Sequence, residues 1–203
     1  MSIWESFRQA HNLSHEQLNQ FKIYYEKIMS VHELFNITAI TELSSVIAYH
    51  FTDSLMIGSA IDMHALHTIV DVGTGAGFPG IPLKIKYPHL SLVLIEVSQK
   101  KIGFLQDVIA SLSLDKCETS MDDWRTFLRK THYDAQLFCS RASLHPDELV
   151  RMFKPSCVYK NARLAYWAST HYELGPVEKP FFEKEVSYTI KNKHRKFIFF
   201  INK

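Results

Sequence analysis

Cysteine, long apolar runs and net charge are all scarce in this sequence of 203 residues. Its three cysteines, Cys117, Cys139 and Cys157, form no C-x-x-C pair, which disfavours a disulfide framework and a cysteine-ligated zinc site. No apolar run has the length of a membrane span, and the opening MSIWESFRQAHNLS lacks the pattern of a signal peptide. The formal net charge of +2 neither requires nor excludes a polyanionic partner. We therefore expect a soluble, cytoplasmic monomer that binds no membrane.

Glycine is also scarce, and its distribution is uneven. Only seven glycines occur, and four of them fall within eight residues of the segment VDVGTGAGFPGIPL (70–83). Glycines directly after an apolar run permit a tight turn and a close backbone approach to a ligand. From Gly75 the segment fits G-x-G-x-x-G, the dinucleotide pattern. From Asp71 it fits D-x-G-x-G-x-G, the loop of S-adenosylmethionine (SAM) methyltransferases.

Three features of the sequence favour SAM over a dinucleotide. Asp71 stands at the end of the apolar run, where a carboxylate can meet the cationic amino acid end of SAM but would repel a pyrophosphate. The next helix is short and begins near Pro79, and a helical segment precedes the first strand. Glu96, at the end of the second predicted strand, can bind ribose hydroxyls of either cofactor. The candidate cofactor residues in this part of the chain are Asp71, Gly73, Gly75, Gly77 and Glu96.

Hydrophobic periodicity predicts the elements around the loop. Residues 1–66 are interpreted as a helical extension, with a capping box at Ser14 and Gln17 and a second helix from about Thr41 to Ile57. The buried side of the first long helix is predicted at Leu18, Phe21, Tyr25 and Ile28. Residues 67–203 alternate strands with helices, which is typical of right-handed βαβ units and a parallel sheet. The predicted strands are 68–72, 91–97, 117–120, 134–140, 162–168, 185–190 and 196–201, the last two forming an antiparallel hairpin.

Several segments together resemble one known family. They are LFNITAI (34–40), HFTDSL (50–55), DVGTGAGFPGIPL (71–83), FLQDVIASLSL (104–114) and YDAQLFCSRAS (133–143). They are similar to the RsmG/GidB family of 16S ribosomal RNA guanine-N7 methyltransferases, over about half of the chain. The resemblance implies an α/β, class I SAM-dependent methyltransferase fold: a mostly parallel, Rossmann-like sheet with an antiparallel C-terminal strand. It implies SAM as the methyl donor and one guanine of the small-subunit ribosomal RNA, free or in the ribosomal subunit, as the substrate.

The resemblance also assigns roles to individual residues. It implies cofactor contacts for Gly73, Phe78, Glu96, Trp124, Arg125 and Arg141. Within this set, Glu96 matches the carboxylate that binds the ribose, and Trp124 with Arg125 matches a pair beside the adenine. Arg141 matches an arginine beside the target base and is our first catalytic candidate. Asn36 is the second: its amide could hydrogen-bond the base or the cofactor, and it could equally cap a helix.

The implied reaction limits which groups are needed. N7 of guanine has a free lone pair and no proton to lose, so attack on the sulfonium methyl group requires no general base. Catalysis should then rest on positioning and on electrostatic stabilisation as charge moves from sulfur to the purine. The histidine pairs His11 with His15 and His64 with His67 lack a nearby third ligand, so we predict no metal site.

The sequence departs from the family at three positions where a basic residue is usual: Tyr49, Asp123 and Trp167. We therefore expect weak binding to naked RNA, with Lys160, Arg163 or the turn KNKHRK (191–196) supplying the missing charge. The turn could instead be simply solvated, and Trp167 could stack on the target base or be a buried strand residue.

The alternatives to the leading function are a methyltransferase for another RNA or a small molecule, a SAM- or RNA-binding homologue without activity, and a nicotinamide oxidoreductase.

Overall fold

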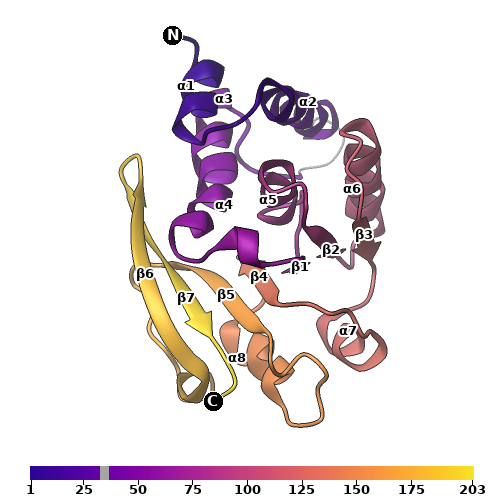
Figure 1. Ribbon diagram of the computed structural model, residues 1–203, viewed down its shortest axis with the longest axis vertical. Coiled ribbons are helices and arrows are strands. Elements are labelled where there is room, and N and C mark those ends of the chain that lie inside the picture. Colours follow the sequence, from indigo (N-terminus) through magenta and orange to yellow (C-terminus); the bar gives the residue numbers. More distant parts are fainter. Residues whose placement is uncertain (33–36) are drawn as a thin grey trace.

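The computed structural model describes residues 1–32 and 37–203, and its elements lie close to the predicted ones (Figure 1). The strands are β1 (Thr68–Val72), β2 (Ser91–Ile95), β3 (Cys117–Ser120), β4 (Leu137–Arg141), β5 (Arg163–Ser169), β6 (Phe182–Ile190) and β7 (Lys193–Phe200). The α-helices are α1 (Ile3–Ala10), α2 (His15–His32), α3 (Leu43–Val46), α4 (Asp53–Leu55), α5 (Gly80–Lys86), α6 (Gln99–Ser111), α7 (Trp124–Lys130) and α8 (Pro146–Leu149). A π-helix, η1 (Ile47–Thr52), and the 3₁₀ turns η2 (Met56–Ser59), η3 (Met63–Ala65), η4 (Val150–Phe153) and η5 (Lys179–Phe181) complete the described elements.

The seven strands form one sheet in the order β3-β2-β1-β4-β5-β7-β6. Strands β1 to β5 are parallel, and β7 runs antiparallel to both of its neighbours, which confirms the predicted sheet and hairpin. The chain runs outward from β1 to β3 and then returns to place β4 on the other side of β1. In open α/β sheets, ligands bind beyond the carboxyl ends of the strands at such a reversal. The ends of β1 and β4 are therefore where a site is expected.

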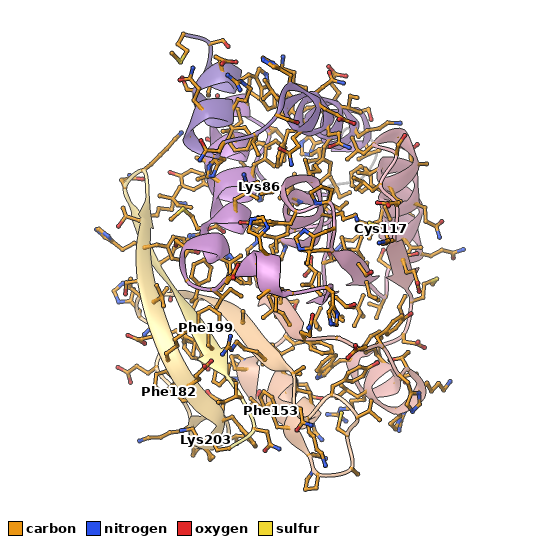
Figure 2. All side chains as sticks on the ribbon, in the orientation of Figure 1. Lys86, Cys117, Phe153, Phe182, Phe199 and Lys203 are labelled. Atoms are coloured by element: carbon orange, nitrogen blue, oxygen red, sulfur yellow. The ribbon has the colours of Figure 1, made fainter. Side chains whose placement is uncertain are left out.

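Both faces of the sheet are covered, because successive side chains of a strand point to opposite faces. Ile69 and Leu92 belong to one apolar cluster, whereas their neighbours Val70 and Val93 belong to another. The first cluster includes side chains of α1, α2, α5 and α6, and the second lies on the side of α7 and α8 (Figure 1). Among the residues labelled in Figure 2, Phe199 belongs to the first cluster and Phe153 to the second, and the partly buried Phe182 packs against the second. The N-terminal helices and the sheet thus share a core, and a domain division at residue 66 stays a prediction.

The predicted helix from Thr41 to Ile57 is present from Leu43 onward, but it is not a regular α-helix. Its middle, Ile47–Thr52, is π-helical, and α3 and α4 flank it. π-Helical turns are rare and occur frequently at functional sites. This one carries His50, and Asp53 follows it directly. Both side chains belong to the site described below.

The capping box at the start of α2 is confirmed. The backbone N–H of Gln17 donates to Ser14 Oγ at 3.1 Å, and the N–H of Ser14 donates to Gln17 Oε1 at 2.9 Å. In the described part of the chain, we find no helix that combines the length and the apolar character needed to cross a bilayer.

Candidate cofactor and substrate site

Two cavities lie beyond the carboxyl ends of the central strands and meet at the glycine-rich loop. The larger cavity has a volume of about 610 Å³ and is lined by Val72, Gly73, Ile95, Glu96, Val97, Lys101, Asp123, Trp124, Arg125, Ala142, Ser143, Leu144 and Glu148. The smaller cavity has a volume of about 340 Å³ and is lined by Ile37, Thr38, Ile40, Tyr49, His50, Gly73, Thr74, Gly75, Ala76, Phe78, Lys101, Arg141, Ala142 and Arg195. Gly73, Lys101 and Ala142 line both, so the two cavities are neighbours across the loop.

Glycines give the loop between β1 and α5 its shape. Gly73, Gly75 and Gly77 have φ angles of 67°, 62° and 103°, which favour glycine. A Cβ on Gly73 would lie 2.3 Å from Ser143 Cβ, and one on Gly77 would lie 2.5 Å from Ile81 Cδ1. A Cβ on Gly75 would meet nothing within 4 Å. Gly75 is therefore required for its backbone conformation, whereas Gly73 and Gly77 are required for close packing as well.

Asp71 is buried at the end of β1 and braces the loop. Its Oδ2 accepts hydrogen bonds from the Thr74 hydroxyl at 2.6 Å and from the Gly80 N–H at 2.7 Å. Burial raises the pKa of Asp71 to about 6. Its Oδ1 is buried without a hydrogen-bond partner among the residues described. Asp71 lines neither cavity, so its direct contact with the amino acid end of SAM stays a prediction, while its bracing contacts are clear.

Glu96 follows β2 and lies in the larger cavity, with 7% of its surface exposed. Its Oε2 accepts a hydrogen bond from the Gly75 N–H at 3.1 Å, and its Oε1 accepts one from the Ser98 N–H at 3.0 Å. The Lys101 ammonium lies 3.7 Å from Oε2. The carboxylate is therefore positioned by backbone groups from both loops that border the cavity.

The predicted adenine pair also lines the larger cavity. The Trp124 indole N–H donates to the backbone carbonyl of Glu148 at 3.0 Å, and Arg125 forms an ion pair with the Glu148 carboxylate at 2.6 Å. The acidic departure beside this pair has a structural explanation. Asp123 is the N-cap of α7, where its Oδ1 accepts a hydrogen bond from the Thr126 N–H at 3.1 Å.

Arg141, at the end of β4, is held firmly in the smaller cavity. Its Nη1 donates to Asp53 Oδ2 at 2.9 Å and to the Tyr49 backbone carbonyl at 3.1 Å. Its Nη2 lies 3.1 Å from His50 Nδ1. The guanidinium also stands 5.2 Å from the centre of the Phe78 ring, on which His50 stacks at 4.5 Å. The structure thus brings together Arg141 and Phe78, two residues that the sequence predicted separately.

Asp53 is fully buried and joins two arginines. Arg141 and Arg195 both donate to its Oδ2, at 2.9 Å and 3.0 Å, and the Tyr188 hydroxyl donates to its Oδ1 at 2.9 Å. Its backbone carbonyl accepts the Trp167 indole N–H at 3.1 Å. Sequence reasoning missed this role. The HFTDSL segment contained Asp53, but nothing placed Arg195, 142 positions away, beside it.

His50 is a neutral member of the same cluster. Burial, with Arg141 and Arg195 nearby, lowers the pKa of His50 to about 3. An arginine can only donate hydrogen bonds, so Nδ1 must be the acceptor and Nε2 must carry the proton. That N–H then donates to Thr38 Oγ1 at 2.8 Å. In the described ranges, no three histidine, cysteine, aspartate or glutamate side chains are arranged to hold a metal ion.

The N-terminal part of the chain contains two predicted residues, Asn36 and a tyrosine of α2. Asn36, the second catalytic candidate, lies outside the described residues, and its role stays a prediction. The tyrosine that α2 buries fully is Tyr24 and not the predicted Tyr25. Its hydroxyl donates to the Ala76 carbonyl of the loop at 2.5 Å. Both tyrosines fit the helical stripe, so only the packing of α2 against the loop separates them.

Other predicted substitutes for the missing charge lie elsewhere. Lys160 and Arg163 line neither cavity, and Arg163 forms an ion pair with Glu183 at 2.8 Å. Trp167 is only 5% exposed and packs edge-on against Phe197, with ring centroids 5.0 Å apart. Its placement agrees with the buried-strand alternative for this residue. The segment 191–196 does reach the site, but only Lys191 and Asn192 form the turn, because Lys193 already begins β7.

Gly73→Ala is expected to damage both the loop and the larger cavity. The added methyl group meets Ser143 and forces a left-handed conformation on alanine. We expect a loss of about 1–3 kcal/mol in the free energy of unfolding, together with weaker SAM binding in calorimetry. Gly103→Ala is the control, because that glycine lies in α6 with open space around it. It should stabilise the protein by roughly 0.5–1 kcal/mol and leave the cavity intact. Equal stability of the two variants would contradict this account.

Comparison with known proteins decides the family. A family model described as "GidB: rRNA small subunit methyltransferase G" matches residues 17–197. The chain belongs to this family. Proteins named ribosomal RNA small subunit methyltransferase G are similar to it. The protein from Aster yellows witches'-broom phytoplasma is 43% identical to this chain, and the match covers 57% of this chain and 54% of the relative. The protein from Macrococcus caseolyticus is 44% identical, and the match covers 57% of this chain and 48% of the relative. The matched region is about half the length of these GidB relatives.

Solved structures confirm the fold predicted for a GidB family member. The human methyltransferase 10 domain containing protein superposes with a TM-score of 0.59, covering 90% of this chain and 96% of its own at 12% identity. At that identity the likeness concerns the fold alone. The sheet order is thus that of a class I methyltransferase fold.

Proposed function

We propose that this protein transfers the methyl group of SAM to N7 of a guanine in small-subunit ribosomal RNA. The observation that carries the proposal is the pair of adjoining cavities at the glycine-rich loop. The larger cavity holds a carboxylate suited to a ribose, and the smaller holds Arg141 on a rigid support. Family membership and the names of the relatives support the same reaction. A ribosomal RNA substrate implies that the protein acts in the cytoplasm. The expected monomeric state can be tested by size-exclusion chromatography.

The residues around the larger cavity fit SAM. Gly73 leaves space that a Cβ would fill, and Glu96 offers acceptors for the two ribose hydroxyls. Trp124 offers an indole surface beside Arg125 for the adenine. The bound cofactor supplies a methyl group on a positively charged sulfur. Because Asp71 braces the loop through Thr74 and Gly80, it acts on the cofactor at least through the shape of that loop.

In the smaller cavity, the protein's part in the reaction is to position the base and to adjust the electrostatics. Guanine N7 needs no deprotonation, and the neutral His50 serves as a fixed support for Arg141 and Phe78. The guanidinium can donate to a guanine acceptor atom while Asp53 balances its charge. Held in this way, Arg141 would orient N7 toward the methyl group without a conformational cost at each turnover.

Glu96→Ala is expected to weaken SAM binding by one to several factors of about ten, because charge-assisted hydrogen bonds are lost. Calorimetric titration with SAM measures the change. Glu118→Ala is the matched control, since Glu118 is an exposed carboxylate on β3 that lines neither cavity. It should bind SAM like the unmodified protein. If Glu96→Ala also binds SAM normally, the ribose lies elsewhere.

Mapping of N7-methylguanine in ribosomal RNA tests the proposed function. Cells without the gene should lack one modification that returns when the gene is restored. The purified protein should add the methyl group to small subunits from the deleted strain. An unchanged map together with normal SAM binding would favour another RNA, a small molecule or an inactive homologue. Binding of NAD in place of SAM would favour an oxidoreductase.

A further inference from the structure

The smaller cavity opens into a basic groove. A third cavity, of about 640 Å³, shares Arg141, Ala142 and Arg195 with the smaller one. We call these two adjoining cavities the basic groove. Its described lining contains no aspartate or glutamate, but it contains four cationic side chains, namely Lys101, Arg141, Lys193 and Arg195. A lining of this kind favours an anionic ligand.

The tip of the β6–β7 hairpin contacts Ser44 of α3 and Tyr49 of η1, and Figure 1 shows the hairpin reaching this part of the molecule. Tyr49 lines the smaller cavity and Lys193 lines the third, so the tip borders the groove. Tyr49 of η1 holds it there. The ammonium groups of Lys193 and Lys191 lie 4.4 Å and 5.6 Å from the centre of the Tyr49 ring, and the Tyr49 hydroxyl donates to Asn192 Oδ1 at 3.2 Å. Lys191 also donates to Ser44 Oγ at 3.2 Å. The tip is therefore docked on the site.

The two lysines at the tip differ from Arg195 and Lys196 of the same hairpin. Arg195 is paired with Asp53, and Lys196 is paired with Glu185 at 2.9 Å. Both tip lysines are exposed, and neither forms an ion pair within the described part of the chain. Lys191 is linked to the Glu42 carboxylate indirectly, because the Ser44 hydroxyl that accepts from Lys191 donates to Glu42. Their charge is thus available to a ligand.

We propose that the tip of the β6–β7 hairpin, with Lys191 and Lys193 held on Tyr49, binds RNA backbone phosphates beside the target guanine. The proposal rests on the proposed function, because it names how the RNA is held at that site. The family resemblance leads us to expect a basic residue at the position of Tyr49. An aromatic ring there provides a platform for cations from the hairpin. The lost charge is thereby replaced from a segment 143 positions away.

Reversing the two charges tests the proposal. The double variant Lys191→Glu/Lys193→Glu should bind a mixed-sequence single-stranded RNA roughly tenfold or more weakly, measured by fluorescence anisotropy. The dependence of log K on log salt should be less steep by about 1.4 units, because each phosphate contact on a single strand contributes roughly 0.7 unit. SAM affinity should not change. The control is Lys130→Glu/Lys179→Glu, which makes the same change in charge at exposed lysines outside the groove and should leave the salt dependence unchanged.

A second double variant controls for misfolding of the hairpin. Lys191→Gln/Lys193→Gln removes the same charges without adding acidic groups, and it should lower the salt dependence equally at an unchanged melting temperature. If this variant and the glutamate variant keep the RNA affinity and salt dependence of the unmodified protein, the hairpin does not bind phosphates. Methyl transfer by the unmodified protein separates the two claims. An active unmodified protein with unaffected variants overturns this inference alone, whereas a protein that never methylates ribosomal RNA overturns the proposed function.

Discussion

Asp53→Ala is expected to lower the free energy of unfolding by about 3–5 kcal/mol, because it removes the buried partner of two arginines. The carboxylate is fully buried, while the Arg141 and Arg195 side chains are 11% and 27% exposed. Without it, both guanidinium groups and the Tyr188 hydroxyl lose the buried acceptor that they share. Urea unfolding followed by circular dichroism measures the loss.

Asp107→Ala provides the control for the Asp53 variant. Asp107 also forms an ion pair, with Lys27 at 2.9 Å, but the Asp107 side chain is 54% exposed. Exposed pairs contribute about 0–1 kcal/mol, so this variant should unfold close to the unmodified protein. If the two variants lose comparable free energies of unfolding, the ion pairs around Asp53 are screened by solvent and do not stabilise the site.

Arg141→Ala is expected to slow the proposed methyl transfer by about 100-fold or more, which is the usual cost of removing a positioned electrostatic donor from an active site. Stability should fall less than in Asp53→Ala, because Asp53 keeps Arg195 and Tyr188 as donors. Single-turnover kinetics with SAM and small ribosomal subunits measure the rate, below the melting temperature of the variant.

A conservative change at the same position sharpens this test. Arg141→Lys keeps the charge, but one ammonium group cannot reproduce the planar arrangement toward Asp53 and His50. It should recover only part of the rate. A folded Arg141→Ala protein with a normal transfer rate would show that Arg141 serves as an ion-pair partner only.

Much of the fold was predictable because its signals are local. Four of the five parallel strands are short apolar runs, while β3 has the mostly polar sequence CETS, and the structure places each of the five within a few residues of its prediction. The π-helical middle of the segment 43–59 was not predictable. Its apolar spacing fits an α-helix equally well, and the irregular turn appears where His50 and Asp53 meet the ends of the sheet.

The sequence by itself determined the order of the elements, the tight glycine-rich turn after the first strand and the family resemblance. These depend on residues that are close along the chain, where backbone conformation and periodicity leave a readable pattern. Only the tertiary structure decided that Asp53 joins Arg141 to Arg195, that Trp167 is buried, and that Lys191 and Lys193 stand on Tyr49. Those contacts join residues far apart in the chain, and they exist because β7 pairs with β5 and brings the hairpin against η1. Periodicity carries no information about such partners, since any exposed lysine or buried aspartate gives the same local pattern.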